Sequence, residues 1–188
     1  MKKLFIASMM LAMSFTHVFA QNDSREPGLY IVNGEESTLM TTQTGSISSS
    51  STGLLGIDLG KTKYNFKGAT SGATSSGTFV MVINPEKKNV TMGLKKYDVF
   101  VSSVTPDNMI IVPLEVVKNK RVYEAGKSIN GFNVSTKDSL PFEWEPLTDN
   151  SYTIKVDLTP GEYAIVFKAT KHANFEFTRV FGFTVPEK

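Results

Sequence analysis

The residues best suited to chemistry stand together in the segment Phe142-Glu143-Trp144-Glu145, which holds the only tryptophan of the chain. If this segment is extended, successive side chains alternate between two faces, so the aromatics share one face and the carboxylates the other, about 7 Å apart on each. Outward aromatics could stack on a sugar or peptide, and paired carboxylates at such separations also occur in glycoside hydrolases. The commoner arrangement buries the tryptophan and leaves both glutamates in solvent. We therefore treat Phe142, Glu143, Trp144 and Glu145 as a candidate ligand-binding site rather than a catalytic one.

Residue types for other chemistry are scarce. The chain has no cysteine, and its two histidines are His17 and His172. Thiolate metal sites and sites built from several histidines are therefore excluded, and no Gly-x-Ser-x-Gly segment offers a nucleophile elbow. The two Asp-Asn dipeptides do not extend into a calcium loop, and the Gly-rich stretch 68–77 lacks the Gly-Lys-Ser/Thr ending of a phosphate-binding loop. We expect no catalytic residue set, no metal and no cofactor.

The N-terminus has the layout of a secretory signal peptide. Lys2 and Lys3 precede an apolar run over residues 4–15, and the small-residue boundary at 18–20 follows. The run is shorter than the roughly 20 residues needed to cross a bilayer. The sequence predicts cleavage after Ala20 and export to the periplasm or the cell exterior, with no transmembrane segment in the mature chain.

Charge argues against two classes of partner. Without Lys2 and Lys3, 20 minus 2 leaves 18 basic residues against 18 acidic ones, so the mature chain is formally neutral. Binding to nucleic acid or to an anionic membrane needs a basic excess or a concentrated basic stripe. We expect no nucleic-acid partner, and a glycan or an envelope protein fits this composition better.

Strand patterns dominate the chain from residue 28 onward. In the segment 152–158 every second residue is apolar, and the turn Thr159-Pro160-Gly161 leads into a similar segment over 162–168. The pair Asn33-Gly34 is a strong hairpin signal. The run 78–83 is nearly continuously apolar, which is typical of a strand buried on both faces, and Gly182 in the last apolar segment would mark a β-bulge.

These elements predict an all-β fold, an antiparallel β-sandwich of immunoglobulin-like or related Greek-key type. Residues 1–20 are the signal peptide, and 21–188 form a single domain with an N-terminal hairpin region, about 27–77, packed on it. About 168 residues can bury roughly two-thirds of their unfolded surface, so no disulfide is needed. The Ser/Thr/Gly-rich stretches 41–53 and 68–77 have few apolar residues and are expected to be mobile loops.

Three segments carry a resemblance: 27–31, 79–83, and 158–164 followed by 181–183. This pattern resembles a group of uncharacterised exported β-sandwich proteins of Gram-negative bacteria, which implies a fold but no activity. The segment Leu-x-Pro-Gly-x-Tyr is also similar to the turn-and-tyrosine corner of immunoglobulin-like and carboxypeptidase-regulatory-like sandwiches. That resemblance implies structural roles for Pro160, Gly161 and Tyr163.

Three functions remain open from the sequence. The leading one is an exported, non-catalytic module that acts in binding, as an adaptor or in association with the envelope. The second is a carboxylate-dependent hydrolase, for example one acting on glycans, that uses Glu143, Glu145 or carboxylates distant in sequence. The third is a strand-exchanging assembly subunit, for which the run 78–83 would supply the exchanged strand.

Overall fold

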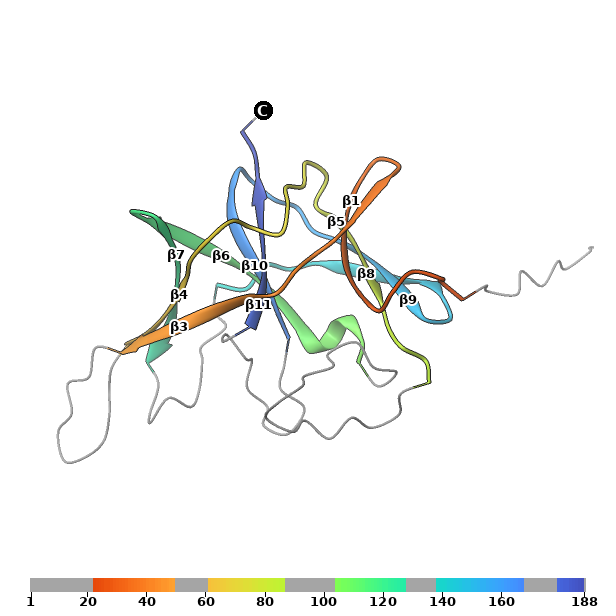
Figure 1. The fold of residues 1–188 in the computed structure, drawn as a ribbon, viewed down its shortest axis with the longest axis horizontal. Helices are drawn as coiled ribbons and strands as arrows, with labels where there is room; N and C mark the ends of the chain where they lie inside the picture. Colours follow the sequence, from red (N-terminus) through yellow and green to blue (C-terminus); the bar gives the residue numbers. More distant parts are fainter. Residues whose placement is uncertain (1–21, 50–60, 87–103, 128–137, 168–178, 188) are drawn as a thin grey trace, which may run out of the picture.

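The computed structural model describes residues 22–49, 61–86, 104–127, 138–167 and 179–187 (Figure 1). Every pairing between its named strands is antiparallel, and the helical content of this part of the chain is one 3-10 turn, η1 (Pro106–Asn108). The predicted all-β, antiparallel class is therefore confirmed. The strands are β1 (Gly28–Asn33), β2 (Glu36–Leu39), β3 (Gln43–Ser49), β4 (Lys61–Phe66), β5 (Thr78–Val82), β6 (Met109–Val117), β7 (Lys120–Lys127), β8 (Glu143–Thr148), β9 (Ser151–Lys155), β10 (Gly161–Phe167) and β11 (Arg179–Val185).

Five strands form an open sheet in the order β2-β1-β5-β9-β8. The β1–β2 hairpin turns next to Asn33, with Gly34 at φ 64°, a value that glycine adopts without steric cost. Strand β5 lies in the middle of the sheet between β1 and β9. Side chains of β5 are buried on both faces of the sheet, and this burial explains why the run 78–83 is almost entirely apolar.

The other six strands close into a barrel in the order β10-β11-β3-β4-β7-β6. One cluster of buried side chains draws on five of these strands and alternates with residues that face outward. The β6–β7 hairpin reverses at Lys118, whose φ of 58° is in the left-handed region. The cluster consists of Tyr64, Phe66, Ile110, Val112, Leu114, Tyr123, Ala164, Val166 and Val180.

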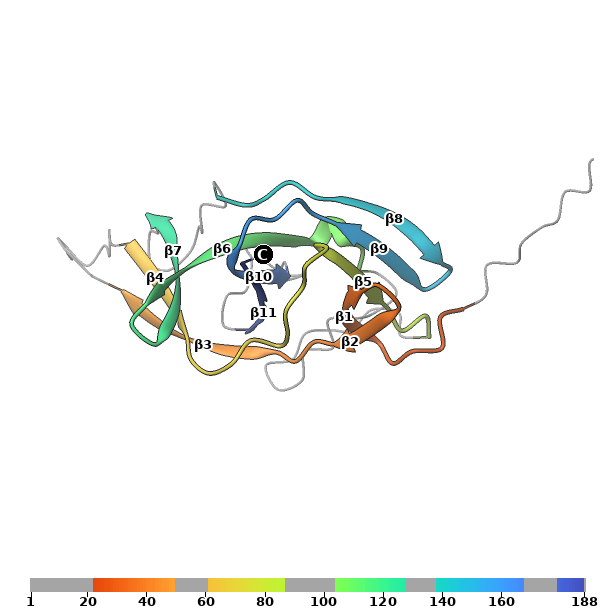
Figure 2. The ribbon, with the colours of Figure 1, turned by 90° about the horizontal axis from the view of Figure 1, so that it is seen from above.

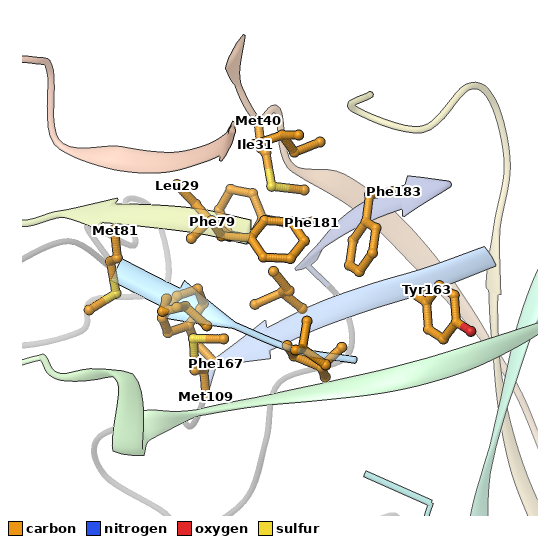
Figure 3. Packing of buried hydrophobic residues seen from close by; sticks show 14 of the residues in the cluster. Leu29, Ile31, Met40, Phe79, Met81, Met109, Tyr163, Phe167, Phe181 and Phe183 are labelled. Carbon is orange, nitrogen blue, oxygen red and sulfur yellow. The ribbon is translucent and has the colours of Figure 1, made fainter. Parts of the chain in front are cut away.

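The sheet and the barrel lie side by side (Figure 2) and share the largest buried cluster (Figure 3). Phe183 of β11 stands at its centre: its ring lies edge-on to Phe79 at 4.9 Å and stacks on Tyr163 at 5.5 Å between centroids. The sheet contributes Leu29, Ile31, Phe79, Met81 and Ile154, and the barrel contributes outward-facing residues of β6, β10 and β11. Strand β10 is thus buried on both sides, because Ala164 and Val166 belong to the other cluster.

The expected sandwich of immunoglobulin-like or Greek-key type is not confirmed, because one of the two sheets is closed into a barrel. The region 27–77 is divided: β1 and β2 belong to the open sheet, whereas β3 and β4 belong to the barrel. Part of the expected loop 41–53 is strand β3, paired with β4 and with β11. Residues 50–53 lie outside the described part of the chain.

The stretch 68–77 is fastened to the barrel rather than free, contrary to the expectation of a mobile loop. Its backbone pairs with β11 through Ser71 N–H to the Gly182 carbonyl at 2.8 Å and through Thr184 N–H to the Gly72 carbonyl at 3.0 Å. Thr74 is fully buried, and its N–H donates to the Thr184 carbonyl at 3.0 Å. These bonds satisfy backbone N–H and C=O groups that a free loop would leave to water.

Candidate functional site

Strand β8, which carries the candidate residues, is the last strand of the open sheet on the side of β9. Its register places Glu143 opposite Lys155 and Trp144 opposite Ile154. Phe142 and Trp144 pack, partly buried, against the cluster shared with the barrel, while Glu143 and Glu145 are exposed. The segment is therefore extended, and its side chains alternate between two faces as the sequence predicts.

Trp144 is held by polar and aromatic contacts. Its Nε1–H donates to Oδ1 of Asp107 at 3.1 Å, and its ring lies edge-on to Tyr152 with centroids 5.4 Å apart and planes at 83°. Asp107 belongs to η1, so this bond ties the edge of the sheet to the turn that precedes β6. Trp144 thus contributes to packing and keeps only part of its ring in solvent.

A groove of about 420 Å³ opens at the end of β8. A smaller pocket of about 90 Å³ adjoins it, and Glu143 and Lys155 line both. The groove is lined by Ser76, Thr78, Pro141, Phe142, Glu143, Lys155, Val156 and Asp157, and the pocket by Glu143, Trp144, Glu145, Thr153 and Lys155. Each of the four candidate residues therefore lines the groove or the pocket: Phe142 the groove, Trp144 and Glu145 the pocket, and Glu143 both.

The charged side chains of the groove and the pocket are exposed. Lys155 Nζ lies 3.2 Å from Oε1 of Glu145, with side chains 61% and 66% exposed. A solvated pair of this kind contributes about 0–1 kcal/mol, so either group can exchange its partner for a ligand at little cost. Glu143 and Asp157 add two further carboxylates along the groove. The arrangement offers hydrogen-bond acceptors, one ammonium donor and the Phe142 ring.

This geometry suits binding better than hydrolysis. A glycosidase needs two carboxyl groups that flank a scissile bond, one of them kept protonated by its environment. Glu143 and Glu145 instead lie two positions apart on one exposed sheet face, and Glu145 is paired with Lys155. Neither glutamate is enclosed, so water is not excluded from the site.

Four polar residues of the groove were not among the sequence candidates: Ser76, Thr78, Lys155 and Asp157. Lys155 and Asp157 share the polar face of the segment 152–158, and that alternation was a usable signal. Ser76 and Thr78 come from the end of the Gly-rich stretch and the start of β5, which only the pairing of β5 with β9 brings to the site.

The three residues with expected structural roles lie at the start of β10. The Tyr163 hydroxyl donates to the Thr159 carbonyl at 2.8 Å and lies 3.1 Å from the Thr159 hydroxyl. Its ring stacks on Phe183 in the shared cluster. Pro160 and Gly161 form the corner that this hydrogen bond spans. None of the three lines the groove.

Within the described residues, no three His, Cys, Asp or Glu side chains come close enough together to hold a metal ion. The same part of the chain contains no helix with the length and apolarity needed to cross a membrane. His172 and the expected signal peptide, 1–20, lie outside the described residues.

No protein-family model, curated protein or solved structure matches the chain.

Proposed function

We propose that this chain is an exported, non-catalytic binding module whose ligand occupies the groove beside β8. The observation that carries the proposal is the groove that Phe142, Glu143, Lys155 and Asp157 line together. Ligand sites combine apolar walls with a few polar groups, and a volume of about 420 Å³ lies within their usual range of roughly 300–1,000 Å³.

The ligand that fits these groups best is a segment of an envelope glycan. Sugar hydroxyls donate to carboxylates and accept from an ammonium, and the apolar face of a sugar ring can stack on an aromatic side chain. The groove presents Glu143, Asp157 and Lys155 for the first role and Phe142 for the second. An envelope protein is the alternative ligand, and a pull-down from envelope fractions with the mature chain would recover it.

Export is part of the proposal, and it is supported by the leader pattern over residues 1–20. Intact-mass measurement of the protein recovered from an envelope fraction tests it directly. We expect a mature chain that begins at Gln21. Recovery of a chain that still begins at Met1 would contradict both cleavage and the proposed location.

A glycan array probed with the mature chain tests the ligand class. We expect binding that weakens at least about tenfold in Phe142→Ala and Asp157→Asn, because tenfold corresponds to about 1.4 kcal/mol, the scale of one lost contact. Lys120→Gln and Asp149→Asn are matched controls, because both residues are exposed and neither lines the groove. Equal binding by all four variants would refute the groove as the site.

The other two functions have specific outcomes in the same experiments. If the mature chain releases reducing sugar ends and Glu143→Gln abolishes that release, the function is hydrolysis rather than binding alone. Strand exchange through 78–83 finds no support, since β5 is an internal strand. The β8 edge also carries Pro146 and an ion pair, features that discourage pairing with a further strand.

A further inference from the structure

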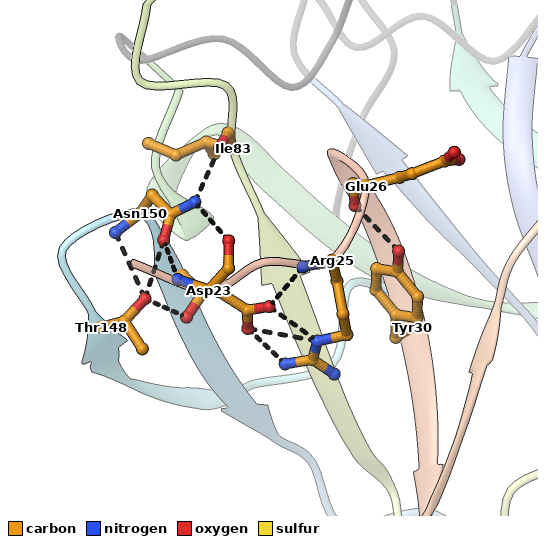
Figure 4. Close-up of polar contacts among 8 residues, drawn as sticks. Asp23, Arg25, Glu26, Tyr30, Ile83, Thr148 and Asn150 are labelled. Carbon is orange, nitrogen blue, oxygen red and sulfur yellow. Dashed lines mark hydrogen bonds and ion pairs between the residues drawn. The ribbon is translucent and has the colours of Figure 1, made fainter. Parts of the chain in front are cut away.

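Residues 22–27, named here the N-terminal strap, contact Asn150 of the β8–β9 turn and Tyr30 of β1 (Figure 4). They form no strand of their own. Tyr30 belongs to a cluster separate from the core that the sheet shares with the barrel. The strap is held at one end by the β8–β9 turn and at the other by β1. Its attachments show what kind of chain segment this part of the sheet can bind.

Asn150 binds the strap through its backbone. The Asn150 side chain is buried, and its Oδ1 accepts the Asp23 N–H at 2.7 Å while its Nδ2–H donates to the Asp23 carbonyl at 3.1 Å. Thr148 Oγ1 bonds the same Oδ1 at 2.9 Å and fixes the orientation of the amide. These two hydrogen bonds engage the backbone N–H and C=O of Asp23, as a neighbouring strand would. They therefore do not depend on the side chain at position 23.

Tyr30 and Ser151 of the sheet contact side chains of the strap. The guanidinium of Arg25 lies 4.9 Å from the centroid of the Tyr30 ring, in a cation–π contact. The Asp23 carboxylate pairs with Arg25 at 2.5 Å, which is the main reason that its pKa lies below the ordinary value, and the Ser151 hydroxyl bonds the same carboxylate. An acid, followed two residues later by arginine, is therefore recognised as a unit.

Tyr30, which the strap contacts, belongs to an apolar cluster, named here the floor. The cluster consists of Tyr30, Val80 and Val82, which are buried and separate from the core shared with the barrel. They stand on β1 and β5, whose positions are fixed by their own pairings and by the opposite face of the sheet. The cradle of floor, Asn150, Ser151 and Tyr30 is thus built without the strap's help.

We propose that this cradle is a peptide-binding site, distinct from the β8 groove, that the chain's own strap occupies in the absence of a partner. Its ligand is an extended segment of another protein in which a carboxylate is followed two residues later by arginine. After the leader cleavage proposed above, the strap is joined covalently to the fold only through Gly28, and its contacts with Asn150 and Tyr30 are noncovalent. A competing segment can therefore replace it without unfolding the sheet.

Binding of a peptide with the strap's own sequence tests the proposal. The probe is fluorescently labelled Asn-Asp-Ser-Arg-Glu-Pro, the sequence of residues 22–27, with both ends blocked. The protein is the full mature chain and its variant Asp23→Gly/Arg25→Gly, which loosens the strap but keeps its length. We expect the variant to bind the probe at least about tenfold more tightly, because the tethered strap competes at a high effective concentration.

Two controls separate recognition from general exposure. The variant Lys63→Ala/Glu124→Ala removes an ion pair of the barrel at 3.0 Å and should bind the probe no better than the native chain. A probe with alanine in place of the arginine should bind the loosened variant several-fold more weakly. Absence of binding to a loosened variant that keeps the native circular dichroism would overturn the proposal, as would equal binding of both probes.

Hydrogen exchange in the native chain gives an independent measurement. The Asp23 amide should exchange at least about a hundredfold faster than the amides of β5, since strap opening does not require sheet unfolding. Equal protection would show that the strap is not displaceable and would refute the proposal. If the native chain is a dimer and the probe dissociates it, the cradle binds the strap of a second copy. That result would contradict our assignment of the ligand to a different protein. Glycan binding by the loosened variant should be unchanged, so failure of one site does not imply failure of the other.

Discussion

Replacement of Phe183 by alanine tests whether the sheet and the barrel share one cooperative core. Phe183 is fully buried and contacts Phe79 of the sheet and Tyr163 of the barrel. Phe→Ala substitutions in a core cost about 3–5 kcal/mol, from lost burial and the cavity that remains. In a domain of 150–250 residues each kcal/mol lowers the melting temperature by about 2–4 °C, so we expect a fall of roughly 6–20 °C.

Urea and thermal unfolding, followed by both circular dichroism and tryptophan fluorescence, measure the effect. Trp144 reports on the edge of the sheet, whereas circular dichroism reports on all strands, so coincident transitions indicate a single unfolding unit. Leu147→Ala is the control, because Leu147 is 51% exposed and its loss should change stability by about 0.5 kcal/mol or less. A Phe183→Ala protein that loses under 1 kcal/mol, or that unfolds in two steps, would refute the shared core.

Three more predictions concern single contacts. Gly182→Ala should destabilise the chain, because a Cβ there would overlap Oε1 of Gln43. The shorter side chain of Gln43→Ala should restore stability in the double variant, as measured by urea unfolding. Asp107→Ala should increase acrylamide quenching of Trp144, since it removes the hydrogen bond to the indole; unchanged quenching would argue against that bond. Burial raises the pKa of Tyr123 to about 12, so the folded state keeps a proton that the unfolded state loses near pH 10, and stability should fall as pH rises from about 10 to 12. Ultraviolet titration of folded protein should accordingly show one tyrosine that ionises near pH 12.

Local alternation in the sequence predicts the strands that are half-buried, because side chains with period two need no knowledge of the partner strand. The segment 152–158 places Tyr152, Ile154, Val156 and Leu158 against the shared core. The Asn33-Gly34 signal likewise predicts the β1–β2 hairpin, because the turn residues alone favour it.

Alternation within one segment does not predict contacts between segments that are distant in the sequence. The stretch 68–77 has the composition of a mobile loop, yet Thr70 bonds the Thr184 hydroxyl at 3.1 Å, 114 positions away. Arg121, which is buried, donates to the Gly68 carbonyl at 2.6 Å and pairs with Glu162 at 3.5 Å. Closure of the barrel depends on pairings of this kind, and a single sequence does not specify them.

Gly182 was expected to mark a β-bulge, but in the structure it makes room for the side chain of Gln43. A bulge at this position would have interrupted the pairing of the last strand. The register instead runs without a break from Gly161 opposite Val185 to Ile165 opposite Phe181, with Gly182 opposite Ala164. The absence of a side chain makes room for Gln43, whose amide enters the space that a Cβ would fill.

The groove depends on strand register more than on the identity of any one residue. The sequence placed Glu143 and Glu145 on one face of β8, but only the pairing of β8 with β9 sets Lys155 opposite Glu143 and leaves Trp144 opposite Ile154. A slip of one residue would exchange the two faces of β8, so that the indole would enter solvent and both carboxylates would face the apolar cluster. Because burying two unpaired carboxylates costs far more than any contact in the groove provides, the core itself enforces the register that assembles the binding surface.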